Sequence, residues 1–205
     1  MLGAAEKFFN FTDRICLAKT VELSQAALAV DAEAKSLCAG LTEKQLSWCT
    51  KPGSWSIAQN LAHLRMTTEV FLPAVDSVLE ASRKLRLHSQ GPFTLNLCSR
   101  VMVWGMDAQP IIKMKAPRLT QPRLLSSSAS ELEHFLILQA ALRQRIADAD
   151  GLDLTALRFP SPVASYLRVN LLEFFSAFNA HSRRHLWQAN NVRRALPLAS
   201  PQNRA

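Results

Sequence analysis

The sequence predicts an all-α protein, a four-helix bundle with a long connection between the second and third main helices. Two observations support this prediction: apolar residues recur at helical spacing in four separate segments, and the signals for β-strands are weak. The length of 205 residues, 48% of them apolar, suits one domain with a sizeable core. We therefore expect a single domain over residues 1–205, with a core at about 20–196 and flexible termini.

The first predicted helix lies near the N-terminus. Its apolar residues are three or four positions apart, which places them on one stripe of the helix. They are Leu23, Ala27, Val30, Ala34, Leu37 and Leu41. Gly40 is placed to end this helix, because glycine tolerates the left-handed conformation that follows many helix C-termini.

The second predicted helix runs from about Ser56 to Ala81. It follows a turn-rich cluster at 51–55 and begins with a capping box, in which Ser56 and Gln59 each satisfy a free backbone N–H of the other. Its apolar residues again have helical spacing. They are Ile57, Leu61, Leu64, Phe71, Val75 and Val78.

Residues 83–121 form the long connection. Three prolines interrupt this region and Pro122 directly follows it, and only Leu95 to Trp104 has a pattern that fits a short helix. A connection of this length inside a compact domain is more often functional or a crossover than a simple turn.

Two further helices follow the connection. The third begins at Ser130, where Ser130 and Glu133 predict a second capping box, and Gly151 can end it. Two prolines bar a helix before Ala164. We expect the fourth helix to run from about Ser165 to Leu196.

The net charge of +8 is concentrated in two blocks. Residues 83–125 carry eight basic and one acidic side chain, and residues 181–205 carry five basic side chains and no acidic one. A basic balance suits nucleic acid, an anionic surface or an acidic ligand, and composition alone does not choose among them. If the connection folds over the same end of the bundle as the second block, residues such as Arg118 and Arg123 would favour an anionic substrate.

The compartment is predicted from the cysteines and the N-terminus. Four cysteines without a C-x-x-C spacing indicate reduced thiols rather than a disulfide framework. The N-terminus has no basic region leading into an apolar one, as a secretory signal would. No stretch approaches the roughly 18 apolar residues of a membrane span. We expect a cytoplasmic protein without a membrane segment.

The histidines are the residues that suggest chemistry. His181 and His185 are four apart on the last helix, so their rings project from one face. His185 falls inside the apolar stripe, His181 lies at its edge, and His63 lies about 100° from the centre of the second helix's stripe. An inward imidazole must be hydrogen-bonded or bound to something. A metal site and core histidines bonded to backbone carbonyls are both open at this point.

Two longer motifs carry a family resemblance. Residues 53–64 read GSWSIAQNLAHL, and residues 181–188 read HSRRHLWQ. Together with residues 40–46 between the first two helices, these segments resemble the DinB-like superfamily of metal-dependent four-helix proteins. The resemblance implies that His63, His181 and His185 bind a divalent metal, most simply zinc or nickel. Three protein ligands would leave a position open for water, a thiolate or a substrate oxygen.

The resemblance also implies a range of functions. The family includes thiol-dependent S-transferases, an isomerase that uses mycothiol and proteins named as hydrolases. The implied partner is a small-molecule substrate, either a low-molecular-weight thiol or an anionic compound, and a homodimer is left open. No catalytic residue beyond the metal ligands is visible. The alternatives are a basic helical module that binds nucleic acid or another polyanion, although nucleic acid is not the expected partner, and a non-catalytic DinB-like protein.

Other residues receive simpler interpretations. Arg184 matches the motif but lies about 100° from His185, so we expect it on the surface or in an ion pair between helices. Trp55 could gate the site, and the simpler expectation is that it anchors the start of the second helix, ahead of the Ser56 cap. His88 and His134 belong to no motif and are expected in solvent. Three phenylalanines of the last helix are expected in the core: Phe174, Phe175 and Phe178.

Overall fold

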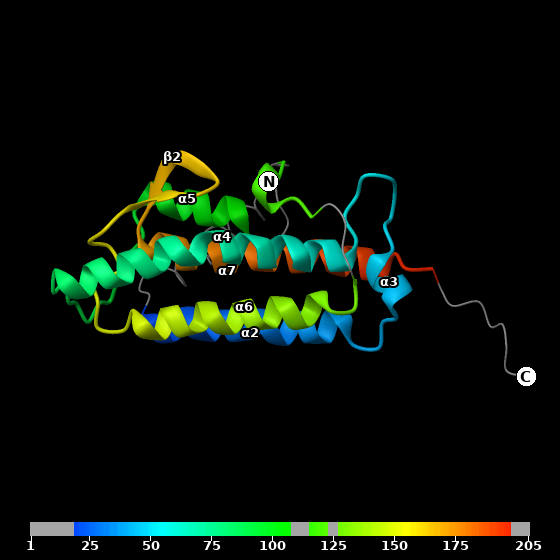
Figure 1. The fold of residues 1–205 in the computed structure, drawn as a ribbon, viewed down its shortest axis with the longest axis horizontal. Coiled ribbons are helices and arrows are strands. Elements are labelled where there is room, and N and C mark those ends of the chain that lie inside the picture. The colour runs from blue at the N-terminus through cyan, green and yellow to red at the C-terminus, as the bar shows by residue number, and fades with distance from the viewer. Residues whose placement is uncertain (1–18, 108–114, 123–126, 198–205) are drawn as a thin grey trace, which may run out of the picture.

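Four long helices form the body of the molecule in the computed structural model, which describes residues 19–107, 115–122 and 127–197 (Figure 1). The long helices are α2 (Thr20–Cys38), α4 (Ile57–Lys84), α6 (Glu131–Asp148) and α7 (Leu171–Arg194). The shorter elements are α3 (Glu43–Ser47), α5 (Leu97–Met106), the 3₁₀ helix η1 (Arg118–Thr120), β1 (Phe159–Ser161) and β2 (Ala164–Val169). The predicted all-α four-helix bundle is confirmed, with one small antiparallel hairpin added.

The helices are arranged so that α2 and α4 each pack against both α6 and α7. Helices α2 and α7 run parallel. Asn179 donates to the Leu23 carbonyl near the start of α2, and Arg193 donates to the Ser36 carbonyl near its end. Residue numbers therefore rise together along both helices, as the colours in Figure 1 also show.

Helices α4 and α6 are parallel as well. Arg65 pairs with Glu131 at 3.1 Å, and eleven residues further along α4 Asp76 pairs with Arg145 at 2.9 Å. Two parallel helices that are consecutive in the bundle need a connection that returns over the bundle's whole length. This requirement explains why residues 85–130 form so long a crossover.

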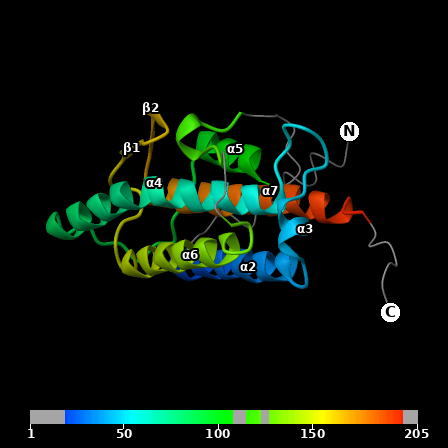
Figure 2. The same ribbon diagram turned by 45° about the vertical axis from the view of Figure 1, so that its right-hand side comes forward.

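The two remaining pairs are antiparallel. In α4 and α7, Asn60 meets His185 while Phe71 stacks on Phe174, so residue numbers rise on one helix and fall on the other. In α2 and α6, the Thr20 hydroxyl donates to Asp150, which follows the end of α6. Helix α5 and the hairpin lie on the outer side of α4 and α7, away from α2 and α6 (Figure 2).

The ends of two helices follow the sequence signals. The Ser56 hydroxyl accepts from the Gln59 amide, and the Gln59 side chain accepts from the Ser56 amide, as the predicted capping box requires. Helix α2 ends at Cys38, and Gly40 has a φ of +73°, which a side chain would disfavour. Both predictions are confirmed.

Two other predictions about helix ends were wrong. The last helix begins at Leu171 rather than Ser165, because residues 164–169 pair with 159–161 as the second strand of the hairpin. Ser130 makes no capping bond, because it has helical backbone angles and its hydroxyl donates to the Ser127 carbonyl instead. The start of α7 has a capping box of its own, between Asn170 and Glu173.

The predictions about free thiols and membrane spans can be compared with the described residues only. The thiols of Cys38, Cys49 and Cys98 are free, as expected, while Cys16 lies outside the described residues. No helix in the described part of the chain is long and apolar enough to cross a membrane. The predicted single domain over 1–205 stays a prediction, because the terminal segments 1–18 and 198–205 are not described.

The buried apolar residues form two clusters rather than one. One cluster joins the start of α2 to the second half of α4, the end of α6 and the start of α7, with the three expected phenylalanines inside it. The other joins the end of α2 to the start of α4, the start of α6 and the end of α7. The three histidines of interest lie near the boundary between the clusters.

Candidate metal centre

The structure brings together all three histidines that the motifs identify. His63 comes from the second turn of α4, and His181 and His185 come from the middle of the antiparallel α7. One ring nitrogen of each lies within 4.8 Å of a ring nitrogen of the others. His63 and His185 are buried and His181 is partly exposed.

The crossover fixes the orientation of His63. Its Nδ1 lies 2.6 Å from the carbonyl oxygen of Thr120 in η1, and a carbonyl can only accept, so Nδ1 carries the proton. Nε2 of His63 then has no proton and carries a lone pair. It lies 3.1 Å from Nε2 of His181. A proton on His181, or a cation between the rings, is needed to satisfy that lone pair.

A side chain of α4 fixes the orientation of His185 in the same way. Nδ1 of His185 lies 3.1 Å from Oδ1 of Asn60. The Asn60 amide nitrogen donates to the Ser56 carbonyl at 2.8 Å, so it is the amide oxygen that faces the ring. His185 therefore donates from Nδ1 and keeps Nε2 as an acceptor. Buried partners of this kind set the tautomer of metal-binding histidines.

Burial keeps the three rings neutral. Desolvation lowers the pKa of His63, although the bond to Thr120 opposes the shift. The pKa of His185 is lowered well below its ordinary value by desolvation and by the neighbouring rings. Desolvation, His63 and Arg184 together lower the pKa of His181 to about 3. Neutral imidazole is the form that binds a metal.

Two neighbours of the cluster differ from their expected positions. The Trp55 ring packs 4.9 Å from the His63 ring and 5.7 Å from the His185 ring, so it covers the histidines as well as preceding α4. Arg184 is buried rather than on the surface, because α5 packs over it and its guanidinium donates to the Gly105 carbonyl at 2.8 Å. Both side chains belong to the wall of the cluster.

This arrangement fits a divalent metal ion. Two of the three rings have Nδ1 engaged and Nε2 free to coordinate, and all three are neutral imidazoles with converging nitrogens. Three imidazoles are a ligand set of catalytic zinc sites and also suit nickel.

Sequence reasoning missed the two groups that orient the rings. Thr120 contributes a backbone carbonyl, which no side-chain pattern reveals, and it lies in the crossover whose fold the sequence does not predict. Asn60 lies in the quoted motif three residues before His63, yet its partner is His185 on another helix. His88 and His134 are exposed, as expected, and Arg123 lies outside the described residues.

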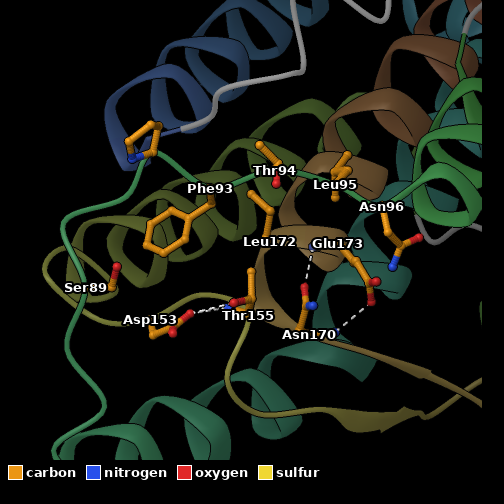
Figure 3. Close-up of a pocket in the computed structure, with 11 residues that line it drawn as sticks. Ser89, Phe93, Thr94, Leu95, Asn96, Asp153, Thr155, Asn170, Leu172 and Glu173 are labelled. Atoms are coloured by element: carbon orange, nitrogen blue, oxygen red, sulfur yellow. Dashed lines mark hydrogen bonds between the residues drawn. The ribbon is translucent and has the colours of Figure 1, made fainter.

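A cavity away from the histidine cluster lies at the start of α7 (Figure 3). Its volume is about 340 Å³, and its polar lining includes Asp153, Asn170 and Glu173. The Glu173 carboxylate is already engaged by Ser99 and Arg158. Glu173 precedes His181 by eight residues, which is about 12 Å along the helix axis. The cavity is separate from the histidine cluster, and its carboxylate serves the fold.

The fold and the cluster define a four-helix-bundle protein with a three-imidazole site between two antiparallel helices. The chain belongs to the DinB superfamily, whose family model matches residues 28–189. A similar solved structure is YfiT from Bacillus subtilis, described as a probable metal-dependent hydrolase with an unusual four-helix bundle topology. The two share 15% identity over 85% of this chain and 86% of YfiT, with a TM-score of 0.49. Among curated proteins, none matches the chain.

Proposed function

We propose that this protein is a metal-dependent enzyme whose divalent ion is bound by His63, His181 and His185. The observation that supports this most directly is the convergence of three neutral imidazoles from two helices, two of them with the tautomer fixed by buried partners. Membership of the DinB superfamily and the motifs at 53–64 and 181–188 support the same ligands.

Zinc and nickel are the proposed ions, because imidazole nitrogen suits both. Such an ion would supply an open position at which it lowers the pKa of bound water or stabilises a thiolate. Other residues of the chain orient and cover the three histidines. The Thr120 carbonyl and Asn60 keep two rings in their binding tautomer, and Trp55 covers the rings on one side.

The proposed reaction is hydrolysis or transfer of a thiol to a small electrophile in the cytoplasm. Both follow from an activated water or thiolate at an open metal position. The buried cation of Arg184 lies close enough to act on the electrostatics of His181 and His185, which favours an anionic substrate or a carboxylate-bearing thiol. A homodimer is compatible with the proposal and is not required by it.

Metal content and thermal stability test the ligand set. Protein purified without an affinity tag should contain close to one equivalent of zinc or nickel by mass spectrometry. Added metal should raise the unfolding temperature, because an ion at a hundred times its Kd stabilises the native state by about 2.7 kcal/mol. The variant His181→Ala should lose both effects, whereas His134→Ala, which changes an exposed histidine, should keep them.

A metal-free protein that gains no stability from either ion would refute the proposal. Metal binding without turnover would instead support the non-catalytic alternative. We would therefore assay the metal-loaded protein with small anionic esters, and with low-molecular-weight thiols plus an electrophile, using His181→Ala as the blank.

A further inference from the structure

Helix α6 places a glutamine where its apolar stripe requires a hydrophobic residue. Phe135, Gln139 and Leu142 are spaced four and three apart, so all three point the same way into the bundle. Phe135 is 0% exposed, Leu142 is 1% exposed and Gln139 is 0% exposed. An amide side chain therefore occupies a core position between two fully buried apolar residues.

Helices α4 and α7, which carry the three histidines, also place a polar residue at a fully buried position between apolar ones. On α4, Thr68 is 0% exposed and lies between the buried Leu64 and Phe71. On α7, Ser182 is also 0% exposed and lies between the buried Phe178 and Leu186. Helix α2 has the small Ala27 and then Val30 at the corresponding interruption.

These polar residues lie at the boundary between the two apolar clusters, and we call this boundary the polar layer. The two apolar clusters stop on either side of it on every long helix. The boundaries are Ala27 and Val30 on α2, Leu64 and Phe71 on α4, Phe135 and Leu142 on α6, and Ala180 and Leu186 on α7. Thr68, Gln139 and Ser182 each fall within these gaps, so they separate the two halves of the core.

The metal centre lies at one edge of this layer. His181 and His185 fall in the same gap of α7 as Ser182, which directly follows His181 and precedes His185 by three residues. On α4, His63 lies one helical turn before Thr67, which is buried next to Thr68. The polar layer thus has members on α4, α6 and α7, and the three histidines lie next to it on α4 and α7.

Several polar atoms of the layer have no hydrogen-bond partner in the protein. Both the oxygen and the nitrogen of the Gln139 side chain lack one, as does the Ser182 hydroxyl. The amide oxygen of Asn179, which lies just outside the layer and one turn before Ser182, also lacks a partner. Thr68 differs, because its hydroxyl donates to the Leu64 carbonyl. Buried polar groups in proteins are nearly always satisfied, by protein or by ordered water.

We propose that this layer is a binding site for ordered water beside the metal centre. The ligand must both donate and accept, because Gln139 offers a free acceptor and a free donor in one side chain and Asn179 offers an acceptor only. It must also be small enough for a close-packed interior. Water meets both conditions, and buried waters in proteins make about three such bonds each. The histidines then border a hydrated layer inside the bundle as well as solvent outside it.

Two measurements on the unmodified protein test this proposal without any assay of metal or activity. A high-resolution crystal structure should show water bonded to Gln139 and to Ser182. In solution, the Gln139 side-chain amide should show a nuclear Overhauser effect to water with the sign of a long-lived complex. A layer without water, or a Gln139 amide bonded to another protein group, would overturn the proposal even if the metal site is real.

A pair of variants on α6 sharpens the test. Gln139→Leu should abolish the water bonded to residue 139, which is the water followed in this test, because it removes a donor and an acceptor at once. Gln144→Leu, on the exposed side of the same helix, should leave that water in place. Retention of the same water in Gln139→Leu would contradict the assignment of Gln139, and the measurements on the unmodified protein stand if that variant fails to fold.

Discussion

Asn60 connects the start of α4 to the histidine cluster through a short chain of hydrogen bonds. Its amide nitrogen donates to the Ser56 carbonyl, and its oxygen accepts from Nδ1 of His185. The backbone carbonyl of Thr120 accepts from Nδ1 of His63 and so orients that ring. One ring is therefore oriented by a side chain that can be mutated, and the other by a carbonyl that cannot.

The variant Asn60→Ala should weaken zinc binding by about 10- to 100-fold, because His185 loses the partner that fixes its tautomer. Asn60→Asp keeps an acceptor at that place and should recover most of the affinity. Competition with a chromophoric chelator measures the change. Asn190→Ala removes an asparagine on α7 that is bonded to Glu33 rather than to a histidine, and this variant should bind zinc normally. An unchanged affinity in Asn60→Ala would refute the orienting role.

The lowered pKa values of the three histidines predict acid sensitivity in the metal-free protein. Desolvation holds the pKa of each ring below its ordinary value of 6.5 in the folded state. Between pH 6.5 and the lowered values the unfolded chain binds more protons, so the free energy of unfolding should fall as the pH falls below 6.5. Urea unfolding in excess chelator at pH 7.5, 6 and 5 measures this loss.

The slope of that curve should decrease in the metal-free variant His185→Phe, since one depressed ring is removed. His88→Phe changes an exposed histidine and should leave the slope as it is. Equal slopes in all three proteins would show that other groups cause the acid sensitivity.

At the scale of the element, the start of α4 matters most because Trp55, Asn60 and His63 all lie within its first turns or just before them. The Ser56 capping box holds this end with two bonds. Removing a capping hydroxyl of this kind costs about 1 kcal/mol. Ser56→Ala should therefore lower the free energy of unfolding by about that amount in urea titrations.

Ser130→Ala is the matched control at the start of α6. Its hydroxyl makes no capping bond, so the loss should be distinctly smaller than in Ser56→Ala. A loss of the same size in both variants would contradict the difference between the two helix starts.

The last helix shows where sequence patterns stop being sufficient. Residues 165–169 contain apolar side chains that a helix or a strand can bury, and only pairing with 159–161 decides for the strand. The start at Leu171 did have a local signal, since Asn170 and Glu173 have the spacing of a capping box. The four long helices were predictable because their stripes are long and regular.

The three histidines of the candidate site were predictable from the sequence, and their surroundings were not. His63 lies off the centre of the apolar stripe of α4, so periodicity alone does not bury it. The crossover does, through η1, and a segment without periodicity gives no signal of where it will pack. Arg184 was misplaced for the same reason, because α5 of that crossover covers it.

At the scale of the whole molecule, three arginines of the basic block 181–205 form ion pairs or hydrogen bonds with other parts of the fold. Arg183 forms a bidentate pair with Asp107. Arg184 donates to Gly105, and Arg193 donates to carbonyls at the end of α2. These contacts hold α5 and α2 against α7. They leave less of this block to face a polyanion than its net charge suggests.

We therefore predict that the protein does not bind DNA in a salt-dependent manner. Fluorescence anisotropy with duplex and single-stranded DNA at about 50 mM salt should show no binding, where a phosphate-neutralising surface would bind strongly. Binding at that salt concentration that weakens steeply by about 200 mM would revive the nucleic-acid alternative.

The antiparallel pairing of α4 with α7 also has a consequence for synthesis of the chain. His63 leaves the ribosome 118 residues before His181, and α7 is made after the other three long helices. A nascent or truncated chain that lacks α7 holds one imidazole of the three and has no chelating set. The proposed ion could be captured only by a chain whose four long helices have all been translated, so a loaded metal would mark a completed bundle.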